Sequence, residues 1–133
     1  MTGETNLDRL LAGMEPVLQP GSYVFATTTD PDLARTAPAR LRFAEVEGTT
    51  LILTAEDAAR LGLQGTFPCR MITLNIHSAL QAVGFLAAIT TELARHGMGV
   101  NPVSGFFHDH LFVPEDRADE ALAALLALSA HHR

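Results

Sequence analysis

Three histidines are the side chains of this sequence best suited to hold a metal ion. His108, Asp109 and His110 follow one another in the segment 106–113, which reads as a strand. Two histidines two residues apart on a strand project from the same face and could bind one metal ion, with His77 as a third ligand. No CxxC or HExxH motif accompanies them. We therefore favour the alternative, histidines satisfied by backbone or water, and predict no metal site.

Asp109 projects from the opposite face of the same segment. It shares that face with Phe107, Leu111 and Val113, which are all apolar. A carboxylate on an apolar face needs a partner, because burying an unpaired charge is costly. Two interpretations stay open, a residue that contacts a ligand and a residue that is paired for structural reasons.

The turn before the predicted helix 82–97 is the second candidate site. The first backbone amides of a helix have no partner within it, so residues 83–85 could donate hydrogen bonds to a small anion. Ser78 and the Asn101 side chain could bind either the carboxylate or the ammonium of an amino acid, and Asp109 could accept from the ammonium. In the alternative, the glycine of this turn only permits close packing and Asn101 only begins a turn.

The elements that must position these residues can be read from hydrophobic spacing. The pattern predicts a short helix before Pro16, a connection over 30–38 and a strand at 70–76, and the stripe Ala82, Leu86, Ile89 and Leu93 predicts a helix that Gly97 ends. The other predicted strands are 23–28, 41–46, 50–54, 99–104 and 106–113, and the other predicted helices are 55–62 and 114–129. Six strands and four helices, with hairpins between helices, favour an α+β fold with antiparallel pairs.

Composition narrows the class of protein. The chain has 133 residues, 47% of them hydrophobic and 18% charged, which is enough for a packed core. A net charge of −6 and the lack of a basic cluster argue against nucleic acid or acidic lipid as a partner. One cysteine, no secretion signal and no long apolar run predict a soluble protein of the cytoplasm.

The segment AVGFLAAITTELARHGMGVNPVSG, which begins at Ala82, resembles the first helix and second strand of an ACT domain. The resemblance rests on Gly84 at the helix start, the aliphatic stripe, Gly97 at the helix end, and the pair Val100 and Asn101. With GFFHDHLFVP from Gly105, the chain as a whole resembles short bacterial proteins built from two ACT-like units. ACT domains are small regulatory modules that bind amino acids in many metabolic proteins.

The resemblance implies an effector site at the turn after the first strand and near the interface between ACT units. By position this turn spans residues 77–85, and the facing second strand supplies Asn101. Many ACT domains have an acidic residue and a proline before the glycine, whereas this chain has Ala82 and Val83. The predicted ligand-binding residues are His77, Ser78, Leu80, Val83, Gly84, Phe85, Asn101 and Asp109.

The resemblance also implies the architecture. We expect a ferredoxin-like fold, with antiparallel sheets and helices on one face, made of two intertwined ACT-like units. The expected units are residues 1–68 and 69–133, packed as one compact body. Both faces of the segment 106–113 are largely apolar, which predicts a homodimer with effector sites near the interface.

These observations favour a regulatory module that senses an amino acid or similar metabolite, without catalytic activity and without a cofactor. The alternative is a small metal-dependent enzyme that uses His108, His110 and His77. A single HDH run cannot supply a nucleophile, a base and an oxyanion donor together. The binding module is therefore the predicted function.

Overall fold

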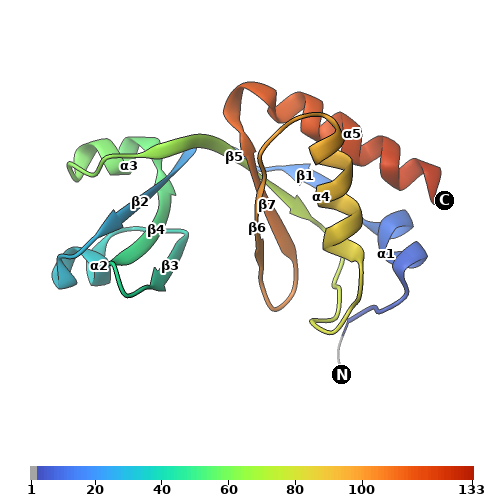
Figure 1. Cartoon of the computed structure of the whole chain (residues 1–133), viewed down its shortest axis with the longest axis horizontal. Helices are drawn as coiled ribbons and strands as arrows, with labels where there is room; N and C mark the ends of the chain where they lie inside the picture. Colours follow the sequence, from blue (N-terminus) through green and yellow to red (C-terminus); the bar gives the residue numbers. More distant parts are fainter. Residues whose placement is uncertain (1–2) are drawn as a thin grey trace. The chain divides into compact units, whose positions relative to one another are not determined.

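The computed structural model describes residues 3–133 and divides into two compact units (Figure 1). Gly21–Cys69 form the first unit, here called the inner unit because its sequence lies between the two segments of the other. The chain up to Pro20 and Arg70–Arg133 form the second, called the outer unit. The expected boundary at residue 68 lies one residue from the end of the inner unit, whereas residues 3–20, which were expected in the first unit, belong to the outer unit. Residues 1 and 2 of the expected first unit lie outside the described residues.

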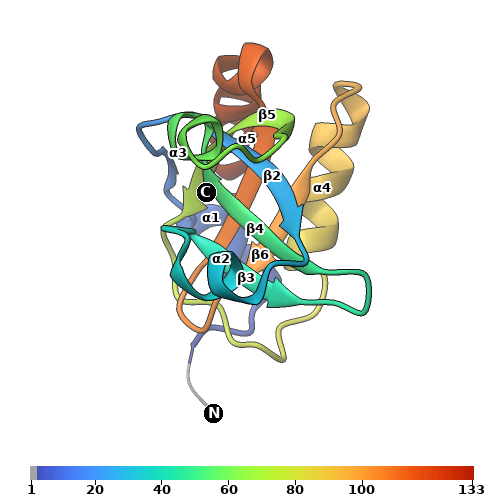
Figure 2. The same ribbon diagram turned by 90° about the vertical axis from the view of Figure 1, so that its left-hand side faces the viewer.

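The inner unit follows the order β2, α2, β3, β4, α3 and the start of β5. These elements are β2 (Tyr23–Thr28), α2 (Pro31–Thr36), β3 (Leu41–Ala44), β4 (Thr49–Thr54), α3 (Ala55–Arg60) and β5 (Thr66–Leu74). The strands pair antiparallel in the spatial order β3-β4-β2-β5. Figure 2 shows β4 beside β2 and β3. Alternate residues of β2 and β4 point toward the helices, so Val24, Ala26, Leu51 and Leu53 form one core with Ala37 and Ala58.

The outer unit combines the N-terminal segment with the second half of the chain. Its elements are α1 (Leu7–Gly13), β1 (Pro16–Leu18), the end of β5, α4 (Phe85–Arg95), β6 (Asn101–Ser104), β7 (Asp109–Pro114), the 3-10 turn η1 (Glu115–Arg117) and α5 (Ala118–His131). The sheet order is β1-β5-β7-β6. Ile72 and Leu74 of β5 pack with Leu111 and Val113 of β7 against the apolar sides of α1, α4 and α5. The helices therefore cover one face of the sheet.

Both units have the same strand order, fourth-first-third-second, which is the ferredoxin-like arrangement. In the inner unit the fourth strand is the start of β5, where Cys69 pairs with Tyr23. In the outer unit β5 acts as the first strand and β1, from the N-terminal segment, acts as the fourth. The predicted fold class is confirmed: the chain is an α+β protein of two ferredoxin-like units that share β5.

Several local predictions were wrong. The segment 30–38 is not a connection, because Pro31–Thr36 form α2. Helix α4 begins at Phe85 rather than at residue 82, and β7 begins at Asp109, so residues 106–108 belong to the hairpin tip and not to a strand. β1 was missed because three residues are too few to show a period. Residues 3–133 thus hold seven strands and five α-helices instead of six and four.

Helix α2 begins because Asp30 caps it and Pro31 occupies its first turn, where a proline loses no helical hydrogen bond. The Asp30 carboxylate accepts the amides of Asp32 at 2.9 Å and Leu33 at 3.3 Å. We expect Asp30→Ala to lower the free energy of unfolding by about 1 kcal/mol and Asp30→Asn, which keeps a cap, by much less. Urea unfolding of both variants measures this, and equal losses would contradict the capping role.

Charged side chains connect the end of α4 to the start of α5. His96 Nδ1 lies 3.1 Å from Glu120 Oε2, and the Arg117 guanidinium donates to Glu120 and to the carbonyl of Gly97. Hydrogen bonds from His96 and then Arg117 hold the pKa of Glu120 below its ordinary value of 4.5. A carboxylate whose pKa is lowered in the folded state stabilises the fold above its ordinary pKa.

That stabilisation is lost as the pH falls from 4.5 through the lower folded-state pKa of Glu120. We therefore expect the wild type to unfold at a higher urea concentration than Glu120→Gln above pH 4.5, and the two curves to converge in more acidic solution. Other carboxylates titrate in both proteins, so the difference between them isolates Glu120. A difference that does not change with pH would contradict the assignment.

Candidate functional site

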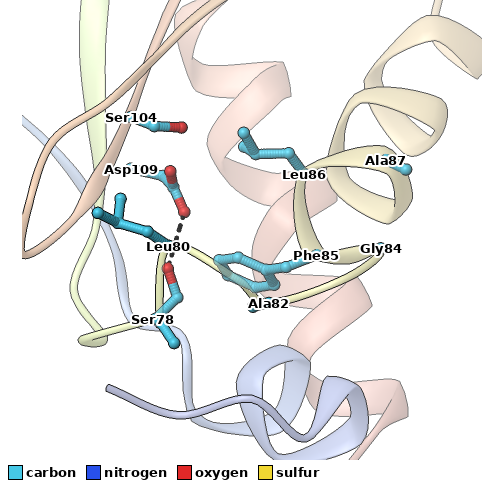
Figure 3. Close-up of a pocket in the computed structure, with 10 residues that line it drawn as sticks. Ser78, Leu80, Ala82, Gly84, Phe85, Leu86, Ala87, Ser104 and Asp109 are labelled. Atoms are coloured by element: carbon cyan, nitrogen blue, oxygen red, sulfur yellow. Dashed lines mark hydrogen bonds between the residues drawn. The ribbon is translucent and has the colours of Figure 1, made fainter. Parts of the chain in front are cut away.

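A cavity of about 140 Å³ lies in the outer unit between the turn that follows β5 and the strands β6 and β7 (Figure 3). We call it the turn cavity. Ten residues line it: Ser78, Ala79, Leu80, Ala82, Gly84, Phe85, Leu86, Ala87, Ser104 and Asp109. They come from the turn, the first residues of α4, the end of β6 and the start of β7.

The N-terminal segment holds the turn in place. The Glu4 amide donates to the carbonyl of His77 at 2.9 Å, and the Ala79 amide donates to the carbonyl of Glu4 at the same distance. Gly3 has φ +92°, and a Cβ there would lie 2.6 Å from the Ala79 nitrogen. Only glycine allows so close an approach without a shift of the backbone. The turn is therefore fixed by a segment more than 70 residues away in the sequence.

The start of α4 opens onto the turn cavity with its amides unused by the helix. Gly84 is the N-cap residue with φ +90°, and no side chain caps the helix there. Phe85, Leu86 and Ala87 occupy the first positions, whose amides have no acceptor within a helix. The positive end of the helix dipole adds to these donors. This end of the cavity favours a negatively charged or strongly accepting group.

A buried carboxylate lies across the turn cavity from the helix start. Asp109 is 6% exposed and Ser78 is 9% exposed, and the Ser78 hydroxyl donates to Asp109 Oδ2 at 3.1 Å (Figure 3). As predicted, Asp109 shares a strand face with Leu111 and Val113, which lie in the core. Asp109 is therefore paired with Ser78 and also lines a cavity, and its contact with a ligand stays a prediction.

Five of the eight predicted ligand-binding residues line the turn cavity. Ser78, Leu80, Gly84, Phe85 and Asp109 line it, whereas His77, Val83 and Asn101 do not. Val83 is 82% exposed. The His77 ring lies 5.4 Å from the ring of Phe107 and 6.3 Å from that of Phe106, measured between centroids.

Asn101 lies at the end of β6 that does not line the turn cavity. It pairs with Phe112, while Ser104, at the other end of β6, pairs with Asp109 and lines the cavity. Ser104 was therefore missed by the sequence reasoning. The signal that could have found it is the register of the hairpin, because a tip at residues 105–108 places Ser104 opposite Asp109.

The histidines do not gather into a metal centre. The rings of His108 and His110 are 6.4 Å apart between centroids, and His110 Nδ1 lies 3.0 Å from Thr73 Oγ1. His77 packs beside Phe106 and Phe107 instead. Within residues 3–133, no three His, Cys, Asp or Glu side chains are grouped so that they could hold a metal ion.

No helix in the described part of the chain has the length and apolar character needed to cross a membrane.

Solved structures of other proteins share this fold. A Vibrio cholerae protein of unknown function, VC0802, described as a possible transport protein, is 40% identical over 92% of this chain and 95% of its own, with a TM-score of 0.84. Protein Atu0741 of Agrobacterium tumefaciens is 16% identical over 87% of this chain and 89% of its own, with a TM-score of 0.72. The search of curated proteins gave no match.

The regulatory subunit of aspartate kinase from Thermus thermophilus, in its ligand-free form, is 10% identical over 89% of this chain and 97% of its own, with a TM-score of 0.64. At such low identity the likeness shows the fold alone. Two family models, both described as ACT domain, match residues 2–70 and residues 66–127. Their overlap falls at the start of β5, the strand that the two units share. The chain therefore belongs to the ACT-domain family, whose members are regulatory modules.

Proposed function

We propose that this protein senses an amino acid or a similar small zwitterion in the turn cavity and acts as a regulatory module without catalysing a reaction. One observation carries the proposal: a buried carboxylate and an uncapped helix start line the same cavity. An amino acid has a negative and a positive group a few ångströms apart. The cavity offers amide donors at one end and Asp109 at the other.

The roles of the lining residues follow from their chemistry. The amides at the start of α4 bind the ligand carboxylate, because they lack acceptors in the helix. Asp109 accepts hydrogen bonds from the ligand ammonium, and its pairing with Ser78 fixes the carboxylate for this contact. Leu80, Gly84 and Phe85 shape the wall of the cavity. In this proposal the contacts change the affinity for another molecule, as in allostery.

We further propose that the protein is a cytoplasmic homodimer. Four of the exposed large apolar side chains of the outer unit lie in the turn before α4 or in the tip of the β6–β7 hairpin: Leu80, Val83, Phe106 and Phe107. A surface of this kind is typical of a protein interface. The one cysteine, Cys69, is buried and free, as is usual in a reducing compartment.

The test is binding of the twenty amino acids, measured by thermal shift and then by calorimetry. At one hundred times Kd a ligand stabilises the folded protein by about 2.7 kcal/mol. We expect one or more amino acids to do so for the wild type and for Asp116→Asn, which removes an exposed carboxylate outside the cavity. Asp109→Asn should bind the same ligand at least about tenfold more weakly, because its amide is uncharged. Equal binding by Asp109→Asn, or no binding by any protein, would overturn the proposal.

A further inference from the structure

The N-terminal segment lies along the turn that precedes α4. The turn spans residues 75–84, and Figure 1 shows the segment before α1 passing beside it. Near the beginning of the turn, a Cβ on Gly13 would lie 3.0 Å from Cδ1 of Ile76. At its end, a Cβ on Gly84 would lie 3.5 Å from Cδ2 of Leu7. The turn is therefore packed against α1 at both of its ends.

The middle of the turn is held by the backbone of Glu4. The Glu4 amide donates to the carbonyl of His77 and its carbonyl accepts the amide of Ala79, which places Glu4 beside Ser78 as in a parallel pair of strands. The Glu4 carboxylate accepts the next two amides along the chain instead. The contact with the turn therefore depends on the path of the backbone and not on the side chain at position 4.

This backbone contact is linked to the charged group of the turn cavity through Ser78. The Ser78 hydroxyl donates to Asp109 Oδ2 at 3.1 Å, and both side chains line the cavity. The hydrogen bonds within the turn join residues only two or three apart, so they shape the turn without fixing its place on the sheet. Release of Glu4 therefore leaves the Ser78 hydroxyl less firmly placed on Asp109.

Gly3 decides whether Glu4 can reach the turn. Its φ is +92°, and a Cβ there would lie 2.6 Å from the Ala79 nitrogen and 2.8 Å from the Ser78 carbonyl carbon. Both are backbone atoms, which cannot rotate away as the end of a flexible side chain can. Gly3 is exposed and belongs to neither core cluster. A side chain at this position should therefore displace the N-terminal segment and leave the core intact.

We propose that residues 3–5 form a strap that sets the geometry of the turn cavity, with Gly3 as its positioning residue, and that the strap and an amino acid in the cavity stabilise each other. The second part rests on the proposed function, since it concerns the occupant of the same site. An amino acid that needs Asp109 in its paired position binds while the strap is docked, so its apparent affinity falls with the docked fraction. The coupling is reciprocal, so a bound amino acid holds the strap in place.

Hydrogen exchange of the full chain without ligand, followed by NMR, tests the strap. The Ala79 amide exchanges when the strap is released, because Glu4 supplies its acceptor. We expect Gly3→Ala to speed this exchange about tenfold or more. Gly21→Ala is the matched control, since Gly21 has φ +95° but the nearest atom to an added Cβ is Tyr23 Cε2 at 3.9 Å. It should leave the exchange of the Ala79 amide unchanged.

Calorimetry with each of the twenty amino acids tests the coupling. Any amino acid that binds the wild type should bind Gly3→Ala about tenfold or more weakly, because the docked fraction is small in this variant, and should bind Gly21→Ala equally well. At one hundred times its Kd the same amino acid should slow the exchange of the wild-type Ala79 amide about tenfold or more. A glycine that served only the stability of the fold would change neither quantity more than Gly21 does.

The outcomes separate the strap from the proposed function. Equal exchange of the Ala79 amide in Gly3→Ala and the wild type, or equal acceleration in Gly21→Ala, would overturn the strap whatever the amino acids do. Faster exchange with unchanged affinity would overturn the coupling and leave the proposed function standing. Absence of binding by all twenty amino acids would overturn the proposed function and the coupling with it, while the exchange rates still decide the strap.

Discussion

Replacement of Ile89 by alanine is expected to lower the free energy of unfolding by about 2 to 5 kcal/mol. Ile89 is 0% exposed in the middle of α4 and belongs to the core that joins this helix to β5, β7, α1 and α5. Alanine removes three carbon atoms and leaves a cavity that the surrounding side chains fill only in part. Because α4 also forms a wall of the turn cavity, the loss weakens the support of the site.

Urea unfolding followed by circular dichroism measures this effect. Ile89→Val removes a single methylene and should cost about 0.5 to 1.5 kcal/mol. Leu126→Ala is the matched control in the same unit, since Leu126 is 47% exposed and its truncation should cost much less. If Ile89→Ala were no more harmful than Leu126→Ala, α4 would not be packed as the structure shows.

The core of the outer unit could be predicted because its helices and strands are long enough for apolar residues to recur at a regular spacing. Ile89 and Leu93 recur at helical spacing in α4, and Ile72 and Leu74 alternate in β5. All four are fully buried. Short elements carry too few residues for such a signal. The three residues of β1 are too few to predict that the N-terminal segment pairs with β5 and completes the sheet of the outer unit.

The candidate site could be predicted where it depends on local sequence and not where it depends on register. Gly84 and Phe85 were found because a glycine before an amphipathic run indicates a helix start. Asp109 was found because it interrupts an apolar face. Asn101 was named by position from the ACT resemblance, whereas Ser104 follows only from the register of the β6–β7 hairpin. The contact of Glu4 with the turn is long-range, and no local pattern reveals it.

The two units differ at the corresponding turn, and this difference limits the number of sites. In the inner unit the first strand leads directly into α2, and the Asp30 carboxylate already accepts the amides of Asp32 and Leu33. In the outer unit a turn of ten residues precedes α4. Gly84, the N-cap residue, has no side chain that could accept hydrogen bonds from the first amides of α4. At the turn before the first helix, an external carboxylate therefore finds open amide donors in the outer unit and not in the inner unit. The proposed function therefore implies one ligand for each chain.

Replacement of Ser78 by alanine is expected to lower the free energy of unfolding by about 1 to 3 kcal/mol. Asp109 is 6% exposed, and within residues 3–133 the Ser78 hydroxyl is the side-chain donor to its carboxylate. Without that donor a largely buried charge loses its partner, and the cost includes its desolvation. Ser104→Ala is the matched control, since it removes an exposed hydroxyl from the same cavity.

A double-mutant cycle with Ser78→Ala and Asp109→Ala separates the pair from its surroundings. If the hydroxyl acts through Asp109, the loss caused by Ser78→Ala should largely disappear once Asp109 is alanine, with a coupling of at least about 0.5 kcal/mol in urea unfolding. Additive losses would show that the Ser78 hydroxyl does not act through Asp109. Because the pairing with Ser78 also fixes Asp109 for the proposed ligand ammonium, Ser78→Ala should bind the amino acid more weakly, and its loss of stability relative to the wild type should grow when the ligand is present.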